Sequence, residues 1–254
     1  MNMVCGPVAA MQGARRMALL GLLLVSVAGC ATGPQADARD PLEPFNRGVF
    51  TFNDAADRAV FKPAAIVYRD VTPVLVRAGV TNFFSNLEDA WSFVNSLFQA
   101  KGQAAASNFM RVSVNTVMGL GGILDPASEM RIERQREDFG QTLGWWGVPA
   151  GPYLVLPLLG PSTLRDLIAM PVDFKGNIAG NLSHVPTRNT FKVLDLLDTR
   201  TGLLSVSAAL DEVALDKYSF TRDAFLQRRA NSVYDGNPPE EGADAKPGTQ
   251  PATR

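Results

Sequence analysis

The sequence predicts a mainly α protein whose helices are joined by loops rich in glycine and proline. Apolar residues recur at intervals of three and four in several segments between residues 40 and 234, which is the spacing of one helix face. No segment shows the alternation of apolar and polar residues typical of a half-buried strand. With 254 residues, of which 46% are hydrophobic, the chain is long enough to bury a substantial core.

Residues 1–29 are predicted to be a secretory signal peptide. Arg15 and Arg16 precede an uncharged apolar run from Met17 to Cys30 that ends in small residues. A basic segment, a short apolar segment and small residues before a cleavage site are typical of such signals. The run is too short to span a membrane comfortably as a permanent helix. Residues 1–10 carry no signal feature, so the true start is Met1 or Met11.

The end of this segment predicts a lipid anchor. The sequence VAGC at 27–30 resembles the bacterial lipobox, in which the cysteine is diacylated and becomes the new N-terminus. Cys30 is therefore the predicted lipidation site, and residues 30–39 form a lipidated tether at the periplasmic face. The alternative is an ordinary signal peptide that happens to contain a cysteine. Ala31 stands where an aspartate would resemble an inner-membrane retention signal, which favours the outer membrane.

The first helix is predicted to begin at Asp40-Pro41. Asp40 can cap it, Pro41 suits the first helical position, and Glu43 completes a capping box. Lys62-Pro63 is expected to end it. The aromatic residues cover more than one face of this helix, which predicts contact with lipid or protein on several sides, unless Phe50 is a single exposed aromatic. The membrane-facing candidates are Phe45, Phe50 and Phe52.

Further helices follow along the chain. Thr72-Pro73 opens a stretch that reaches Phe98, and three polar residues (Asn82, Ser85 and Asn86) are expected to break it in two. A helix over 102–118 leads to a glycine-rich loop at 119–126. Ser162 is predicted to cap a helix that ends at Pro171. Two more helices are expected over 187–204 and 207–232, and residues 235–254 have the composition of a disordered tail.

Catalytic chemistry is not indicated. The only histidine, His184, stands in a predicted loop without partner residues, which indicates a structural or exposed role. No nucleophile elbow, phosphate-binding loop or cluster of cysteine and histidine ligands is present, so no cofactor, metal or catalytic residue is expected. A formal charge of −1 without a basic stripe argues against nucleic-acid binding. An acid–base enzyme with converging carboxylates remains the alternative.

Five blocks of sequence resemble the MlaA (VacJ) lipoprotein family in order and spacing, from about residue 40 to about residue 234. The blocks are DPLEPFNRGVFTFND, NFFSNLEDAWSFVNSLFQ, NTVMGLGGILDPAS, DFGQTLGWWGVPAGPYLVLPLLGPSTLRD and YSFTRDAFLQRR. The resemblance implies an MlaA-like helical domain over 40–234 that forms a membrane-embedded ring in the inner leaflet of the outer membrane, with an amphipathic pore. It also implies removal of mislocalised phospholipid from the outer leaflet. The implied partners are a trimeric porin and a soluble periplasmic lipid carrier, MlaC.

The uncharged stretch from Phe139 to Leu164 fits such a pore. It holds five glycines and four prolines, which forbid one straight membrane-spanning helix. Irregular backbone at membrane depth survives only where it packs on protein or lines a wet cavity. The alternative is a buried loop in a soluble core. The pore and loop candidates are Gly144, Trp145, Trp146, Gly147, Pro149, Gly151 and Pro152.

Head-group contacts are expected from basic residues near apolar segments, because an unpaired phospholipid head would be costly to desolvate. The candidates, chosen only by charge and by this proximity, are Arg47, Lys62, Arg69 and Arg111. Two other functions remain open at this point. One is a structural lipoprotein that scaffolds porins, and the other is a periplasmic lipid hydrolase.

Overall fold

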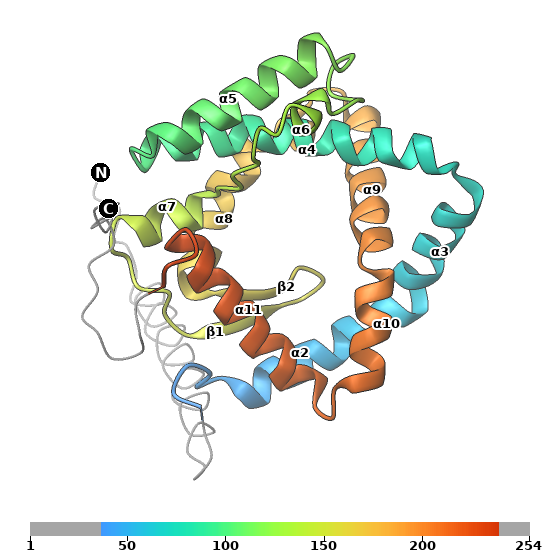
Figure 1. Cartoon of the computed structure of the whole chain (residues 1–254). Helices are drawn as coiled ribbons and strands as arrows, with labels where there is room; N and C mark the ends of the chain where they lie inside the picture. The colour runs from blue at the N-terminus through green and yellow to red at the C-terminus, as the bar shows by residue number, and fades with distance from the viewer. Residues whose placement is uncertain (1–36, 239–254) are drawn as a thin grey trace, which may run out of the picture.

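The computed structural model describes residues 37–238, and their helices form a ring (Figure 1). The predicted signal peptide, most of the tether (30–36) and most of the tail (239–254) lie outside the described residues. The prediction of a mainly α fold is confirmed. The elements are α2 (Glu43–Ala56), η1 (Asp57–Phe61), α3 (Lys62–Val71), α4 (Val74–Phe98), α5 (Gly102–Val117), α6 (Pro126–Glu129), α7 (Phe139–Trp145), β1 (Tyr153–Leu156), β2 (Gly160–Thr163), α8 (Leu164–Gly176), η2 (Ala179–Asn181), α9 (Val185–Gly202), α10 (Leu204–Val213) and α11 (Lys217–Val233).

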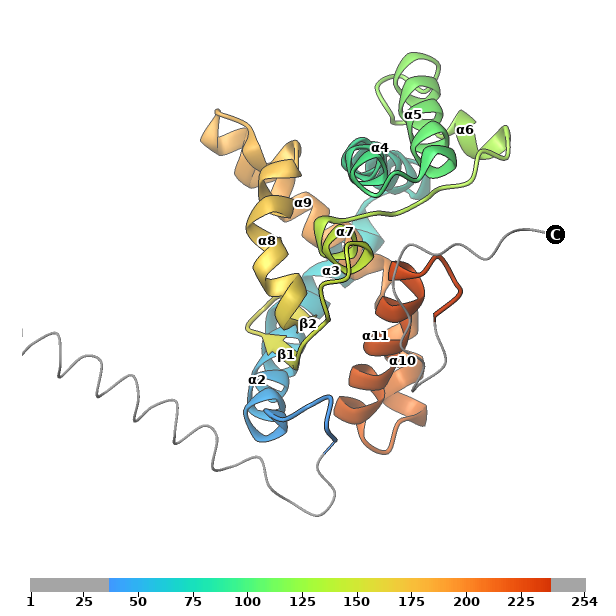
Figure 2. The same ribbon diagram turned by 90° about the vertical axis from the view of Figure 1, so that its left-hand side faces the viewer.

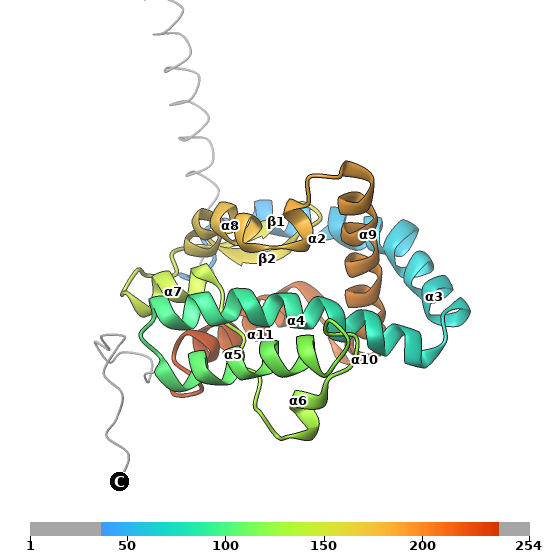
Figure 3. The ribbon, with the colours of Figure 1, turned by 90° about the horizontal axis from the view of Figure 1, so that it is seen from above.

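The ring is closed by contacts between elements that are distant in sequence. α4 packs along α5 and also contacts α9, which in turn packs on α3. On the other side, α2 contacts β1, β2 contacts α8, and α8 packs on α7, which returns to α4. Figures 2 and 3 show the hairpin and α8 toward one face of the ring, with α11 and α5 toward the other. The chain therefore encloses a space without forming a single layered core.

The first helix does not end at Lys62-Pro63 as predicted. A π-helical turn, η1, joins α2 to α3, and Pro63 lies in the first turn of α3. Proline clashes with the carbonyl four residues earlier in a regular helix. The wider π turn, in which the Lys62 N–H donates to the Asp57 carbonyl, accommodates it. Asp40 does not cap α2 either, because it is buried and accepts a hydrogen bond from Asn46.

α4 is one unbroken helix of 25 residues, so the predicted break at its polar residues is wrong. Asn82 donates to the carbonyl of Ile123, and Asn86 donates to Thr116 at 3.1 Å. Ser85 accepts a hydrogen bond from Arg134 at 2.8 Å. These side chains bond to the neighbouring segments and leave the helix's own backbone hydrogen bonds intact.

The uncharged stretch contains an antiparallel hairpin that sequence patterning did not predict. β1 and β2 pair Tyr153 with Thr163 and Leu156 with Gly160. Leu158 and Gly160 have φ angles of 62° and 83° at the turn, where glycine relieves the strain of left-handed backbone. β1 consists of four apolar residues (Tyr-Leu-Val-Leu), so it shows no alternation of apolar and polar residues. The stretch forms no straight spanning helix, as its prolines predicted.

Two boundaries in the C-terminal half also differ from the prediction. Thr163, and not Ser162, caps α8, and this helix continues through Pro171 to Gly176. The expected helix over 207–232 is divided at residues 214–216, where Asp216 caps α11 by accepting from two backbone N–H groups. Its side chain also accepts a hydrogen bond from Arg47 of α2. Asp216 thus both caps the start of α11 and forms a long-range ion pair with α2.

Polar groups are concentrated inside the ring wall and apolar groups outside it. The largest fully buried side chains include Asn46, Asp89, Asn95, Gln99 and Asn108. The apolar core cluster is small and centres on two tyrosines and a valine (Tyr153, Val155 and Tyr218). Large apolar side chains are exposed on most helices. Among residues 37–238, no helix is both long and apolar enough to cross a membrane.

Candidate functional site

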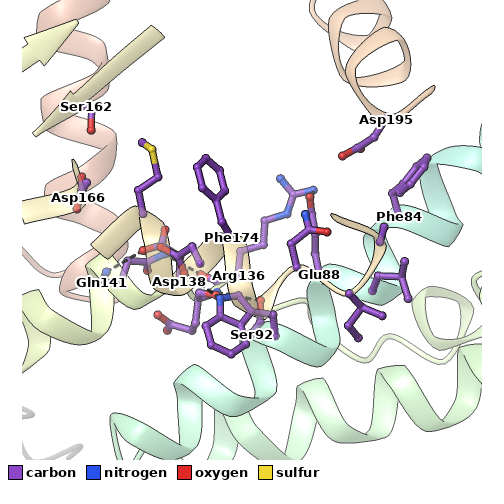
Figure 4. Close-up of a pocket in the computed structure, with 18 of the residues that line it drawn as sticks. Phe84, Glu88, Ser92, Arg136, Asp138, Gln141, Ser162, Asp166, Phe174 and Asp195 are labelled. Carbon is purple, nitrogen blue, oxygen red and sulfur yellow. Dashed lines mark hydrogen bonds and ion pairs between the residues drawn. The ribbon is translucent and has the colours of Figure 1, made fainter. Parts of the chain in front are cut away.

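The candidate site is the cavity inside the ring, which we call the central cavity and which has a volume of about 530 Å³. This volume falls in the range of pockets that bind small molecules and cofactors. Its walls come from α4, residues 136–141, β2, α8, η2, α9 and α11 (Figure 4). The apolar lining residues are Phe84, Leu87, Trp91, Met170, Phe174, Ile178 and Phe225; the charged ones are Glu88, Arg136, Glu137, Asp138, Asp166, Asp173, Asp195 and Arg229.

One end of the central cavity is held together by Arg229 of α11. Its guanidinium contacts Asp138 at 2.7 Å and Asp166 at 2.8 Å, and so links α11 to the start of α7 and to α8. Burial alone would raise the pKa of Asp138, but the hydrogen bonds from Arg229 outweigh it and hold this pKa below its usual value. These groups are therefore charged and paired, which is what a buried ion-pair network requires.

Trp91 closes the wall between α4 and α8. Its indole Nε1 donates to Asp173 at 2.8 Å, and the backbone N–H of Phe139 donates to the same oxygen. A Cβ added to Gly176 would lie 2.3 Å from the indole ring, so only glycine permits this contact. Burial raises the pKa of Asp173 in spite of the two hydrogen bonds.

Asp195 of α9 differs from the other carboxylates of the central cavity. Within the part of the chain that the structure describes, no group donates a hydrogen bond to it or forms an ion pair with it. Burial, and then the nearby carboxylates of Glu88 and Asp198, raise the pKa of Asp195 to about 6. The structure thus places in the wall of the cavity a carboxylate that has no hydrogen-bond or ion-pair partner among residues 37–238.

Two of the predicted loop residues belong to a helix instead, and a third follows directly after it. Gly144 and Trp145 are part of α7, and Trp146 follows its last residue. A Cβ on Gly144 would lie 2.6 Å from Arg165, so this glycine serves close packing. The Trp145 ring lies under Lys101, whose Nζ is 4.7 Å from the ring centroid. The structure therefore corrects the assignment of Gly144 and Trp145 as loop residues, whereas Trp146 lies in the connection between α7 and β1.

The other predicted loop residues do lie in the connection between α7 and β1. Gly147 and Gly151 have φ angles of 92° and 68°, a conformation that favours glycine. Gly147 and Pro149 line a second cavity of about 310 Å³ beside α11. The Pro152 carbonyl accepts from the backbone N–H of Leu164 at 3.1 Å. None of the seven pore and loop candidates lines the central cavity.

The four head-group candidates all have acidic partners outside the central cavity. Arg111 is buried and bonded to Asp89 and Asp125, so its proposed role in head-group contact is corrected to a structural one. The remaining pairs are Arg47 with Glu43 and Asp216, Lys62 with Asp211, and Arg69 with Asp70. The sequence analysis did not single out Arg136 and Asp195. No pattern of neighbouring residues indicates that a charged side chain lines a cavity.

The membrane-facing candidates differ in how far the structure exposes them. Phe45 and Phe52 are 58% and 54% exposed, as expected for an outward face. Phe50 is half-buried, packs edge-on against Tyr218 at 5.6 Å between ring centroids and adjoins the apolar core cluster, so on this side the helix contacts protein. His184 caps α9 by accepting from the backbone N–H of Thr187, which is a structural role.

The chain is similar in sequence to known proteins. The MlaA lipoprotein family matches residues 38–232. The intermembrane phospholipid transport system lipoprotein MlaA of Escherichia coli (strain K12) is 34% identical over 225 residues, which are 84% of this chain and 86% of that protein. The protein of the same name from Haemophilus influenzae is 35% identical over 229 residues, or 85% and 89% of the two chains.

A solved structure from work on the structural basis for maintenance of bacterial outer membrane lipid asymmetry has the same architecture. It aligns with a TM-score of 0.67 and 34% identity, and the alignment covers 76% of this chain and 98% of the other. An identity at this level over most of both chains, together with the family match, decides the relationship: the chain belongs to the MlaA lipoprotein family.

Proposed function

We propose that this protein is an outer-membrane lipoprotein that removes mislocalised phospholipid from the outer leaflet through the central cavity. The observation that carries the proposal is the central cavity itself, which offers charged groups and apolar groups along its walls. A phospholipid presents a charged head and apolar tails, and the head needs polar partners when it leaves water. The names of the relatives, which refer to intermembrane phospholipid transport, support this assignment.

The outer surface of the ring supports a position within the membrane. Large apolar side chains are exposed on α3, α4, α5, α8 and α10, which lie in different parts of the ring (Figure 1). Monomeric soluble proteins rarely expose contiguous apolar surface of this kind. In lipid, helix association depends on hydrogen bonds and close packing and not on an apolar core, which fits the polar interior of the ring wall. We therefore propose that the helices lie within the membrane.

The proposal includes two protein partners and no covalent chemistry. A trimeric outer-membrane porin would hold the ring in the membrane, and a soluble periplasmic carrier of the MlaC kind would receive the lipid. The paired carboxylates of the central cavity are occupied by structural hydrogen bonds, which is unlike a general acid–base pair awaiting a substrate. Transport would maintain the lipid asymmetry of the outer membrane.

Lipidation of Cys30 is the anchor that we propose. Each buried methylene of an acyl chain contributes about 0.8 kcal/mol, so several chains together bind firmly. Changing Cys30 to alanine is expected to abolish incorporation of radioactive palmitate into the protein, because the sulfhydryl is the acylation site. Cys5→Ala is the matched control and should keep full labelling. Undiminished label on the Cys30→Ala variant would contradict the lipoprotein assignment.

The transport path is tested by narrowing the central cavity. Met170 lines the cavity on α8, whereas Ile168 of the same helix is 65% exposed. Met170→Trp is expected to lower the amount of intact phospholipid that co-purifies with the protein several-fold, because the indole occupies the lipid's space. Ile168→Trp, the control, should leave it unchanged. Native mass spectrometry of detergent-purified protein measures bound lipid and bound porin together.

The same measurement separates the alternatives. Intact phospholipid bound to the wild type and lost from Met170→Trp supports transport through the cavity. Porin without lipid in the wild type would favour a structural scaffold. Production of lysophospholipid would favour a hydrolase. Equal lipid in both tryptophan variants and the wild type would place the lipid path outside the central cavity.

A further inference from the structure

The charges of the central cavity form two groups, which differ in how firmly they are bonded to the protein. Asp138, Asp166 and Asp173 accept hydrogen bonds that join α7, α8, α11 and α4. Glu137 is likewise buried, and it accepts from Lys101 at 2.9 Å. Because these carboxylates are bonded to the protein itself, they hold the wall together and are not available to a ligand.

The second group consists of Glu88, Arg136 and Asp195, which we call the free charges of the cavity. Glu88 and Arg136 are 56% and 69% exposed at their side chains, and the closest approach between them is 3.9 Å. Glu88 also accepts a hydrogen bond from Arg134 at 3.3 Å, and Arg134 is itself held by Asp89. Asp195 has no partner among the described residues. Figure 4 shows Asp195 of α9 and Glu88 of α4 extending from two walls into the same space. Glu88 and Arg136 are thus exposed and held only by long ion pairs, and Asp195 has no partner among the described residues, so a ligand inside the ring can reach all three.

The surroundings of Asp195 favour a cation. Glu88 faces it from α4, and Asp198 lies one turn further along α9. From α3, Tyr68 donates to Asp198, and from α4, Thr81 does the same. Because burial and like charges both disfavour the ionised carboxylate, the pKa of Asp195 is raised to about 6. A ligand cation placed between the two carboxylates would relieve this repulsion.

We propose that the free charges of the cavity select the zwitterionic head of an aminophospholipid, with its ammonium between Asp195 and Glu88 and its phosphate at Arg136. The proposal rests on the proposed function and names the lipid class for the same cavity. Phe84, Phe174 and Ile178 supply the apolar lining beside these charges. An anionic lipid without an amine is disfavoured, because it brings further negative charge toward two carboxylates.

The test compares two lipids on one protein. Detergent-purified full-length protein is incubated with vesicles of equal parts phosphatidylethanolamine and phosphatidylglycerol, and native mass spectrometry gives the ratio of the bound lipids. At pH 7.5 the wild type is expected to favour phosphatidylethanolamine by about fivefold, which corresponds to a small difference in binding free energy. Asp195→Asn and Glu88→Gln should each bring the ratio toward one, and Arg136→Gln should lower the binding of both lipids.

Controls separate selection from folding and from the proposed function. Asp70→Asn, on an exposed pair outside the cavity, should keep the wild-type ratio. Glu88 is exposed, so its substitution tests the proposal even where Asp195→Asn fails to fold. Lowering the pH to 5 protonates Asp195 and should reduce the preference in the wild type but not in Asp195→Asn. Free phosphoethanolamine, which lacks tails, should not displace the bound lipid.

Each other result has a distinct meaning. The proposed selection is overturned if both Asp195→Asn and Glu88→Gln keep the wild-type ratio of bound lipids. It is also overturned if the wild type binds both lipids without preference. In either case the transport function stands. Displacement by free phosphoethanolamine would overturn the requirement for a lipid. Absence of any bound phospholipid from the wild type would overturn the proposed function, and the selection with it.

Discussion

Replacing Asp89 with alanine is expected to cost about 3 to 5 kcal/mol of unfolding free energy, the typical loss when one partner of a buried ion pair is removed. Asp89 is fully buried on α4, and its two oxygens accept from Arg111 of α5 and from Arg134. Without it, the guanidinium of Arg111 remains buried with Asp125 as its only carboxylate partner among the described residues. The packing of α5 on α4 depends on this centre.

Urea unfolding in detergent, followed by circular dichroism, measures the effect of Asp89→Ala. The matched control is Asp70→Ala, which removes an aspartate from an exposed pair with Arg69. Exposed pairs contribute little, so this variant should keep the midpoint of the wild type. A midpoint for Asp89→Ala equal to that of the control would show that the buried network does not stabilise the ring wall.

Replacing Asn46 with alanine is expected to cost roughly 2 to 4 kcal/mol, because buried polar groups lose their partners. Its amide donates to Asp40 at 2.8 Å and to the Tyr153 carbonyl at 3.0 Å. Its oxygen accepts from the backbone N–H of Val155 at 2.9 Å. One fully buried side chain thus joins α2 to the hairpin, at the place where the ring is closed.

Hydrogen exchange gives the sharpest measurement of the Asn46 variant. The amide of Val155 should lose protection, and the melting temperature should fall. Asn231→Ala is the control, because Asn231 is exposed on α11 and alanine suits a helix. If the amide of Val155 kept its protection in Asn46→Ala, the hairpin would be held by its own strand pairing and not by α2.

Both predictions depend on the same property of the fold. Asp89 and Asn46 are buried polar residues in a wall whose outer surface carries exposed apolar side chains. Where lipid surrounds a protein, apolar contacts between helices give little advantage over apolar contacts with lipid. Hydrogen bonds in the wall then carry more of the specificity, which explains why its strongest contacts involve carboxylates, amides and guanidinium groups.

Local features were predictable from the sequence because they depend on neighbouring residues. The helices over 74–98 and 102–117 show the spacing of apolar residues that a helix requires. The prolines of residues 139–164 exclude a single straight helix, and no such helix forms. The order of the five sequence blocks was enough to indicate the family, which the comparisons confirm.

Polar residues were interpreted wrongly where their partners are distant in sequence. Asn86 was expected to interrupt a helix, but it bonds to Thr116, thirty positions away. Arg111 was expected to contact lipid, but Asp89 and Asp125 enclose it. A polar side chain that breaks a helix or faces solvent cannot be distinguished locally from one that bonds across a packed wall.

By itself, then, the sequence determined a mainly α chain, a break in its long uncharged stretch and membership of one lipoprotein family. Only the tertiary structure decided which residues face the central cavity. Glu88, Arg136 and Asp195 come from three separate segments, and they meet because the ring closes through contacts between distant elements. The reason is physical: helix formation depends on spacing within a few turns, whereas an enclosed site depends on how whole helices pack together.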